Sequence, residues 1–358
     1  MELFMQIKYG PIGQVYMELT NICNFDCAFC PNEIMTRKKG VMKKETAIRI
    51  LDEISDINLT KKMMFHLMGE PTLHPNLTEL ITYANDKGIK IVLNTNGARL
   101  DGKLLDRVYN LGLDRLIISL QTPTEGTYSL RRARMDFPAY ISKVKDIVRK
   151  KFEQRSNIPL ELHLLNSTDA RLLGLDEDFI VLENDKIAQD ILLDWIKFGK
   201  DVEKEHDVEK VRHDMKKIRK ISLKNGFRYE IVRGVHIISR RTTTWANTMV
   251  KGKRIIPAFL GSCDGLKNQF GILWDGRCVM CCIDYDGKTA LGNVNDTPLS
   301  KIWLSKDAER IRKNLQRNIL VHPYCQICRG GANITSWAMR QLGSIAIYKL
   351  GFNYIFPD

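Results

Sequence analysis

The chain has 358 residues and a formal charge of +13, from 55 Lys and Arg against 42 Asp and Glu. With 44% hydrophobic and 27% charged residues, its composition is that of a globular protein and excludes disordered and fibrous classes. No run approaches the ~18 to 20 apolar residues of a membrane span, and the N-terminus lacks the pattern of a signal peptide. We therefore expect a cytoplasmic protein whose nine cysteines are metal ligands or redox groups rather than disulfides.

Strand and helix patterns alternate along the first 165 residues. Strands are predicted at residues 14–20, 63–68, 89–95, 115–120 and 160–165, and helices at residues 45–57, 75–87, 104–111 and 138–149. Strands separated by about 10 to 15 helical residues indicate βαβ units and a parallel sheet. The spacing predicts an α/β fold, a partial (β/α)6 barrel of the TIM type, with residues 229–239 as the sixth strand.

Polar residues recur at alternate positions of the predicted strands. Because helices cover the outside of such a barrel, we expect these polar side chains to point inward. They concentrate near the C-terminal ends of the strands, where the active sites of parallel barrels lie. The pairs that share a parity are Glu18 with Thr20, His66 with Glu70, Asn94 with Asn96, Ser119 with Gln121, and Glu161 with His163.

The pattern loosens after residue 165. Helices are predicted at residues 185–200, 202–224 and 299–316, and Asp-Gly turns at residues 275–276 and 286–287 indicate hairpins. The apolar tail, residues 332–358, is expected to pack on the body, with a membrane-surface helix as the alternative. These changes divide the chain into a core barrel (1–165), a barrel completion and helical insert expected to set substrate specificity (166–260), a small cysteine-rich α+β domain (261–331) and the tail (332–358).

The first cysteine cluster lies in the segment CNFDCAFC, after the first predicted strand. Cys23, Cys27 and Cys30 can face one point only if the loop wraps around it. Zinc favours a fourth Cys or His ligand, and the next His along the chain is His66. Three cysteines without a fourth ligand suit a [4Fe–4S] cluster that keeps one iron open, and a zinc knuckle completed from afar is the alternative.

The spacing C-x3-C-x2-C, with Phe29 before the last Cys, resembles the radical S-adenosylmethionine (radical SAM) superfamily over about residues 12 to 165. The resemblance implies that Gly69, Glu70 and Pro71 form the motif that holds the methionine amino group and that Phe29 lies near the adenine. It also places Asn94 and Ser119 where the family contacts the methionine carboxylate and the ribose. It further implies that the open iron binds S-adenosylmethionine, whose reductive cleavage yields a 5′-deoxyadenosyl radical that abstracts a substrate hydrogen.

A second cluster, in the last third of the chain, comprises Cys263, Cys278, Cys281, Cys282, Cys325 and Cys328. It resembles the SPASM and twitch extensions of radical SAM enzymes, which carry auxiliary iron–sulfur clusters. Because no cysteine follows Cys328, it is similar to the shortened twitch form with one auxiliary [4Fe–4S] cluster, as in the aminocyclitol dehydrogenase of butirosin biosynthesis. A hairpin at residues 275–276 would return Cys281 to Cys263, and Cys325 with Cys328 would complete the four ligands; a zinc ribbon is the alternative.

Cys278 and Cys282 are left without a ligand role. On a continuous strand they would share one face, and Cys281 would point to the other. They are either buried small hydrophobic residues, or one of them is a hydrogen-atom donor or an alternative ligand.

The leading hypothesis is a radical SAM oxidoreductase that oxidises a hydroxylated small molecule, such as a sugar or aminocyclitol, with the auxiliary cluster as electron acceptor. Candidates for polar catalytic groups are His163, Glu161, Arg131 and Arg132. The alternatives are an epimerase or peptide-modifying enzyme that uses Cys278 or Cys282 as hydrogen donor, and a zinc-stabilised nucleic-acid-binding protein.

The positive charge permits an anionic substrate and an acidic electron donor such as flavodoxin or ferredoxin. Since the basic residues are spread along the chain, we expect no specific nucleic acid partner and no membrane contact.

Overall fold

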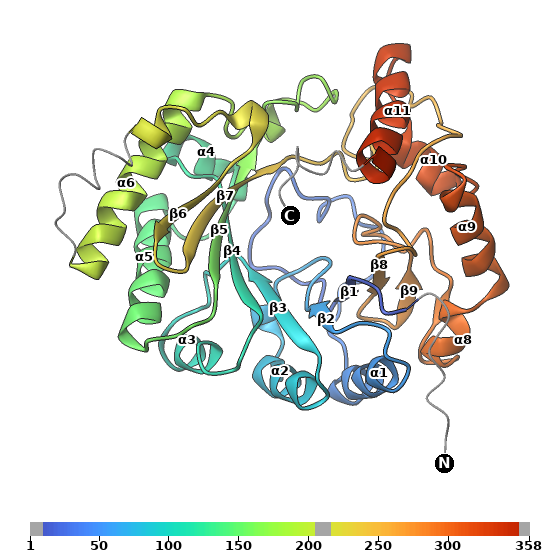
Figure 1. Ribbon diagram of the computed structural model, residues 1–358, viewed down its shortest axis with the longest axis horizontal. Coiled ribbons are helices and arrows are strands. Elements are labelled where there is room, and N and C mark those ends of the chain that lie inside the picture. The colour runs from blue at the N-terminus through green and yellow to red at the C-terminus, as the bar shows by residue number, and fades with distance from the viewer. Residues whose placement is uncertain (1–9, 205–215, 351–358) are drawn as a thin grey trace.

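The computed structural model describes residues 10–204 and 216–350. In these ranges one ten-stranded sheet has the order β10-β9-β8-β1-β2-β3-β4-β5-β7-β6. Six neighbouring parallel strands form the curved barrel sheet: β1 (Gln14–Met17), β2 (Lys62–Met64), β3 (Lys90–Thr95), β4 (Arg115–Gln121), β5 (Leu160–Asn166) and β7 (Val235–Arg241). The chain therefore has the expected partial barrel (Figure 1).

The barrel helices lie outside this sheet (Figure 1). They are α1 (Lys44–Asp56), α2 (Leu77–Asp86), α3 (Gly102–Val108), α5 (Phe137–Glu153) and α6 (Asp185–Glu203). The connections contain α4 (Glu125–Tyr128) and the 3-10 helices η1 (Pro71–Leu73), η2 (Ser129–Arg131), η3 (Glu177–Phe179) and η4 (Leu223–Asn225). In α1 the buried residues Ala47, Ile50, Leu51 and Ile54 have the spacing of one helix face, which is why this helix packs on the sheet.

The sixth strand differs from its prediction as one strand over residues 229–239. It is a hairpin, in which β6 (Arg228–Val232) runs antiparallel to β7. The two-residue turn contains Gly234 with φ +72°, a conformation that suits glycine. Only β7 continues the parallel barrel, and β6 forms the outer edge of the sheet. Of the helix predicted at 202–224, residues 205–215 lie outside the described ranges.

The C-terminal region extends the barrel sheet. Strand β8 (Gln269–Ile272) pairs in parallel with β1 and forms with β9 (Arg277–Val279) the hairpin predicted at residues 275–276, and β10 (Gly292–Asn293) adds a third strand. The helix predicted at 299–316 is two helices, α8 (Leu299–Trp303) and α9 (Lys306–Gln316), because the Ser305 hydroxyl caps a new start by accepting from the Ala308 N–H at 3.3 Å. Helix α10 (Pro323–Arg329) follows.

Helix α11 (Ile334–Leu350) contacts the body of the protein. The Trp337 indole donates to the Pro257 carbonyl at 3.0 Å, and Gln341 Oε1 accepts from the Leu260 N–H at 3.1 Å. Tail residues 351–358 lie outside the described ranges. Within the described ranges, every helix is too short or too polar to cross a membrane.

Candidate active site

The three cysteines of the first cluster line one cavity of about 220 Å³ at the C-terminal end of the barrel, which we call the thiol cavity. They lie in the loop between β1 and α1, where the Cys30 N–H donates to the Cys27 carbonyl at 2.9 Å. Burial raises the pKa of Cys23 to about 11 and that of Cys30 to about 12. The loop therefore gathers three protonated thiols around one space, and a bound metal would displace their protons.

Gly69 and Glu70 line the opposite part of the thiol cavity. Gly69 has φ +75°, and a Cβ there would stand 2.3 Å from the Thr20 carbonyl oxygen, so only glycine lets the chain pass. The Glu70 carboxylate is hydrogen-bonded within the protein. It accepts from Thr72 Oγ1 and Thr95 Oγ1 at 2.6 Å each and from the backbone N–H of Asn96 at 2.8 Å. The next residue, Pro71, is buried in η1 and is not part of the cavity wall.

A chain of side-chain hydrogen bonds crosses the floor of the thiol cavity. Ser119 Oγ donates to Asn94 Oδ1 at 2.7 Å, and Asn94 Nδ2 lies 3.0 Å from His66 Nε2. Burial lowers the pKa of His66 to about 4, so its imidazole is neutral and Nε2 accepts from the Asn94 amide. Asn94, Ser119 and Phe29 all line the cavity.

The two candidate arginines lie in different environments, Arg131 buried and Arg132 exposed. Arg131 is 1% exposed, lines the thiol cavity, and donates to the Ser119 carbonyl at 2.7 Å. Its guanidinium lies 4.8 Å from the centre of the Phe25 ring. Arg132, in contrast, is exposed and pairs with Glu33, so a catalytic role for Arg132 does not fit its position.

A second cavity of about 560 Å³ fills the barrel interior, and we call it the barrel cavity. Its lining includes Tyr16, Arg115, His163, Arg240 and Cys282. The sequence analysis missed Trp245, which follows β7 and lines both cavities; its position depends on an irregular turn that no periodic pattern predicts.

Glu161 on β5 is the centre of a charge cluster behind the barrel cavity. Its Oε1 pairs with Arg115 at 3.0 Å and with Arg228 at 2.7 Å, and its Oε2 lies 2.8 Å from His163 Nε2. Burial alone would raise the pKa of Glu161, but the hydrogen bond from His163 and the neighbouring positive charges lower it from 4.5 to about 2. Burial lowers the pKa of His163, so its imidazole is neutral at neutral pH and keeps the Nδ1 lone pair while Nε2–H donates to Glu161.

The cluster predicts an acid-dependent contribution to stability. Because the folded pKa of Glu161 lies below its ordinary value of 4.5, its stabilisation is present above that pH and is lost as the pH falls toward 2. We expect E161Q to lower the free energy of unfolding by about 2 kcal/mol at neutral pH, a modest value because Arg115 and Arg228 are partly screened by solvent. The loss should be much smaller near pH 3, because wild-type Glu161 has by then lost part of its own stabilisation. Urea unfolding of the cluster-free protein at both pH values measures this, with the exposed Glu45→Gln as control; equal losses at both pH values would contradict the assignment.

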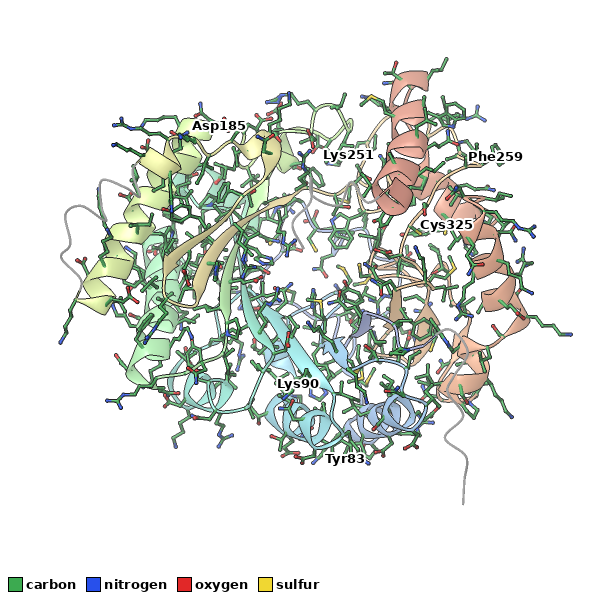
Figure 2. All side chains as sticks on the ribbon, viewed as in Figure 1. Tyr83, Lys90, Asp185, Lys251, Phe259 and Cys325 are labelled. Carbon is green, nitrogen blue, oxygen red and sulfur yellow. The ribbon has the colours of Figure 1, made fainter. Side chains whose placement is uncertain are left out.

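Four cysteines of the second cluster, Cys263, Cys281, Cys325 and Cys328, lie in one region of the structure, and Cys282 lies next to Cys281 there. A Cβ at Gly265 would stand 3.5 Å from Cys263 Sγ and 3.6 Å from Cys281 Cβ. Burial raises the pKa of the Cys325 thiol, and the neighbouring Cys263 and Cys328 raise it further. Cys325, labelled in Figure 2, lies on α10 with Cys328 one turn further along.

Cys278 and Cys282 do not share a face, contrary to the prediction, because β9 ends at Val279 and the chain turns before Cys282. Cys278 is completely buried in the main hydrophobic core and lines neither cavity, which fits the small hydrophobic role and removes it as a hydrogen donor. Cys282 lines the barrel cavity, with its Sγ 3.6 Å from Gln269 Oε1.

The cysteine loop is fastened to the C-terminal region by buried polar contacts. Arg37 binds the buried Glu18 carboxylate with both guanidinium NH2 groups, one bond being 2.6 Å, and its Nε donates to the Tyr285 carbonyl at 2.5 Å. The Asp286 carboxylate accepts from Thr36 N and Oγ1 at 2.8 and 2.7 Å. The two cysteine sites are thus parts of one framework.

Two segments of the chain match known sequence families. Residues 17–163 match the Radical SAM superfamily, and residues 263–329 match SPASM, an iron-sulfur cluster-binding domain. The chain carries a Radical SAM domain and a SPASM domain. The Radical SAM domain implies S-adenosylmethionine with a [4Fe–4S] cluster in the barrel, and the SPASM domain implies auxiliary iron–sulfur binding in the C-terminal region, which replaces the zinc alternatives.

Several relatives of this radical SAM protein are named by function. A tungsten-containing aldehyde ferredoxin oxidoreductase cofactor-modifying protein of Pyrococcus furiosus is 28% identical over 30% of this chain and 30% of its own. A PqqA peptide cyclase of Granulibacter bethesdensis is 30% identical over 31% and 29%, and an S-adenosyl-L-methionine-dependent 2-deoxy-scyllo-inosamine dehydrogenase of Niallia circulans is 27% identical over 30% and 44%. The matched parts span less than half the length of these relatives.

A solved structure supports the fold over most of the chain. The structure of BtrN in complex with AdoMet and 2-DOIA superimposes with a TM-score of 0.51 at 16% identity, covering 87% of this chain and 89% of BtrN. At this identity the likeness concerns the fold alone.

The donors present fit the iron–sulfur clusters that the two domains imply. Three cysteines line the thiol cavity, and further cysteines lie near one another in the C-terminal region. Thiolate sulfur is the ligand that iron–sulfur clusters take, with one thiolate at each ligated iron.

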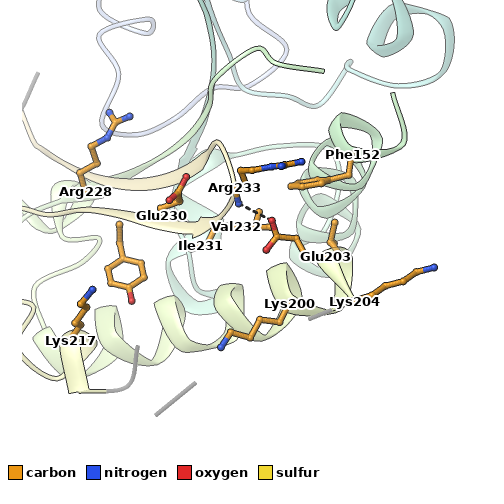
Figure 3. Close-up of a pocket in the computed structure, with 12 residues that line it drawn as sticks. Phe152, Lys200, Glu203, Lys204, Lys217, Arg228, Glu230, Ile231, Val232 and Arg233 are labelled. Atoms are coloured by element: carbon orange, nitrogen blue, oxygen red, sulfur yellow. Dashed lines mark hydrogen bonds between the residues drawn. The ribbon is translucent and has the colours of Figure 1, made fainter. Parts of the chain in front are cut away.

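A further hollow on the surface is not part of this site. It has about 940 Å³, lies between α6 and β6, and is lined mainly by charged residues such as Lys200, Glu203 and Arg233 (Figure 3). None of the nine cysteines is among its lining residues.

Proposed function

We propose that this radical SAM protein is an oxidoreductase that converts a hydroxyl group of a small molecule, sugar-like or aminocyclitol-like, into a carbonyl group. The observation that carries the proposal is the barrel cavity. It adjoins the thiol cavity on one side and reaches the Cys281–Cys282 segment on the other. A substrate in it would therefore lie between the S-adenosylmethionine site and an auxiliary [4Fe–4S] cluster held by Cys263, Cys281, Cys325 and Cys328.

Oxidation of a secondary alcohol removes one hydrogen atom, one proton and one electron. The bound cofactors supply a 5′-deoxyadenosyl radical as hydrogen acceptor and an auxiliary cluster as electron acceptor. We assign the proton to His163 Nδ1, because the imidazole is neutral and its Nε2 is engaged by Glu161 at 2.8 Å. Glu161 acts through His163 as a positioning residue, and Arg115 and Arg228 keep its carboxylate ionised.

Arg131 has a different proposed role at the thiol cavity. It is buried, it is positively charged, and the Cys27 thiol is a neighbour that favours its charged form. We assign it to balancing the negative charge of the ligated thiolates rather than to proton transfer.

The substrate class follows from the barrel lining. A volume of about 560 Å³ suits a small molecule. Lys62, Arg115 and Arg240 outnumber Asp264 among the charged residues of the wall, but Lys62 pairs with Asp114 at 3.2 Å and Arg115 with Glu161 at 3.0 Å, so the lining does not favour an anionic substrate over a neutral one. The dehydrogenase among the relatives acts on an aminocyclitol by its name, which supports the hydroxylated substrate. We further propose that residues 166–260 set specificity and that an acidic flavodoxin or ferredoxin supplies electrons to this basic chain.

One observation favours a second candidate, an epimerase that returns a hydrogen atom from Cys282. The Cys282 thiol lines the barrel cavity but not the thiol cavity, so it would meet a substrate from the side away from the cofactor. Modification of a peptide is the further alternative, supported by the peptide cyclase among the relatives.

One experiment separates these functions. Reduced holo-protein is incubated with S-adenosylmethionine and carbon-deuterated aminocyclitols or sugars, and deuterium in 5′-deoxyadenosine identifies the substrate. The oxidoreductase predicts a ketone that wild type and C282A form equally, and a fall of about 10²-fold in ketone per cleavage for H163Q. The epimerase predicts no ketone, an inverted product with solvent deuterium in D2O, and loss of that product in C282A. Ketone formation that survives in H163Q would remove His163 as the base.

A further inference from the structure

The chain after β7 has an unusual backbone. Trp245, Ala246 and Asn247 are three successive non-glycine residues with positive φ, at 47°, 59° and 65°. The left-handed conformation is unfavourable for residues that carry a Cβ. Such a turn persists only where its surroundings fix it, and strain of this sort concentrates at functional sites.

The surroundings that fix the turn belong to the auxiliary site. Asn247 Nδ2 donates to the Ile327 carbonyl at 2.7 Å and to the Gly330 carbonyl at 3.0 Å, and its Oδ1 accepts from Arg340 at 2.5 Å. Ile327 lies on α10 between the ligand cysteines 325 and 328. The turn is therefore held by the same helix that carries two auxiliary ligands.

At the other side of the turn, Trp245 reaches the first cysteine loop. Its indole Nε1 donates to the Phe29 carbonyl at 3.1 Å, and its ring meets the Tyr285 ring edge-on at a centroid distance of 6.3 Å. The two cavities share four lining residues, namely His66, Leu67, Asn94 and Trp245. The first three lie on or next to β2 and β3, so Trp245 is the member that comes from the opposite part of the chain.

We propose that Trp245 is the partition between the two cavities and a specificity-determining residue. The inference rests on the proposed function, because it places S-adenosylmethionine in the thiol cavity and the substrate in the barrel cavity. The indole presents an apolar face to both ligands, limits how far a substrate can enter the thiol cavity, and separates the Cys282 thiol from the reactive carbon of the cofactor. Because Trp245 lines both cavities, removing the indole would widen the opening between them.

The test uses holo-protein and three single variants. W245A removes the partition, and W245F keeps a ring but loses the bond to Phe29. The matched control is W337F, which loses the same kind of indole-to-carbonyl bond, at 3.0 Å to Pro257, outside both cavities. Equilibrium binding of S-adenosylmethionine to the unreduced protein is measured first, and we expect about tenfold weaker binding in W245A, a smaller loss in W245F and none in W337F.

The second readout is the origin of the hydrogen in 5′-deoxyadenosine formed in D2O without substrate. If the partition is lost, the exchanged Cys282 thiol becomes a donor, so deuterium content should rise several-fold in W245A and return to the wild-type level in the W245A/C282A double variant. Wild-type binding and wild-type deuterium content in W245A would overturn the inference. If W245A does not fold, S-adenosylmethionine binding at the wild-type level in W245F would overturn the inference. A wild-type protein that binds but does not cleave S-adenosylmethionine would instead refute the proposed function, and the binding comparison would still decide the role of Trp245.

Discussion

The C27A variant should not cleave S-adenosylmethionine. Cys27 is the central thiol of the loop that lines the thiol cavity, and its loss would leave Cys23 and Cys30 as two ligands for a cluster that needs three. We expect 5′-deoxyadenosine to be undetectable and iron and sulfide to fall by about half, because the auxiliary site would keep its own cluster.

The matched control for this variant is C278A. Cys278 is completely buried in the core and lines neither cavity, so its replacement should leave the iron content unchanged. Anaerobic reconstitution, iron and sulfide analysis, and chromatography of the cleavage products measure both variants. A C27A protein that still produced 5′-deoxyadenosine would refute the assignment of this loop as the site of cleavage.

Replacing Cys281 and Cys325 together should remove the auxiliary cluster and leave the first cluster in place. The two residues come from different segments, the turn after β9 and helix α10, so the double change removes ligands from both sides of the site. Iron should again fall by about half, while S-adenosylmethionine is still cleaved without coupled product, because the electron acceptor is missing.

The control here is C282A, the immediate neighbour of Cys281 whose thiol faces the barrel cavity instead. It should keep the iron content of the wild type. If iron stayed at the wild-type level in the double variant as well, Cys281 and Cys325 would not be ligands, and the auxiliary site would have to be built differently.

Local chemistry made much of this site predictable from the sequence. The spacing of Cys23, Cys27 and Cys30 fixes a loop that can enclose only a small space, and the structure shows that space as a cavity. Gly69 was singled out by the resemblance to the radical SAM family, and the structure gives a physical reason for glycine there, because a Cβ would stand 2.3 Å from the Thr20 carbonyl oxygen. Alternation on β5 also placed Glu161 and His163 together, since residues two apart on a strand share a face.

The failures concern positions that tertiary contacts decide. Residues 229–239 have one continuous strand pattern, yet Gly234 turns the chain and makes a hairpin. Cys278 and Cys282 were expected on one face, but the end of β9 at Val279 sends them to different environments. Trp245 gave no signal, because its position depends on Asn247 bonding to a helix about 80 residues further along the chain.

The parallel pairing of β8 with β1 means that the auxiliary domain is not a separable attachment. Residues 269–272 satisfy the backbone groups of β1 on the side away from β2, at the flank where an incomplete barrel would otherwise end. A barrel cut off before residue 261 would expose β1 as an unprotected edge, which invites association with other chains. The first strand is therefore fully paired only after the chain has been synthesised through residue 272. Assembly of the barrel thus depends on synthesis of the C-terminal third.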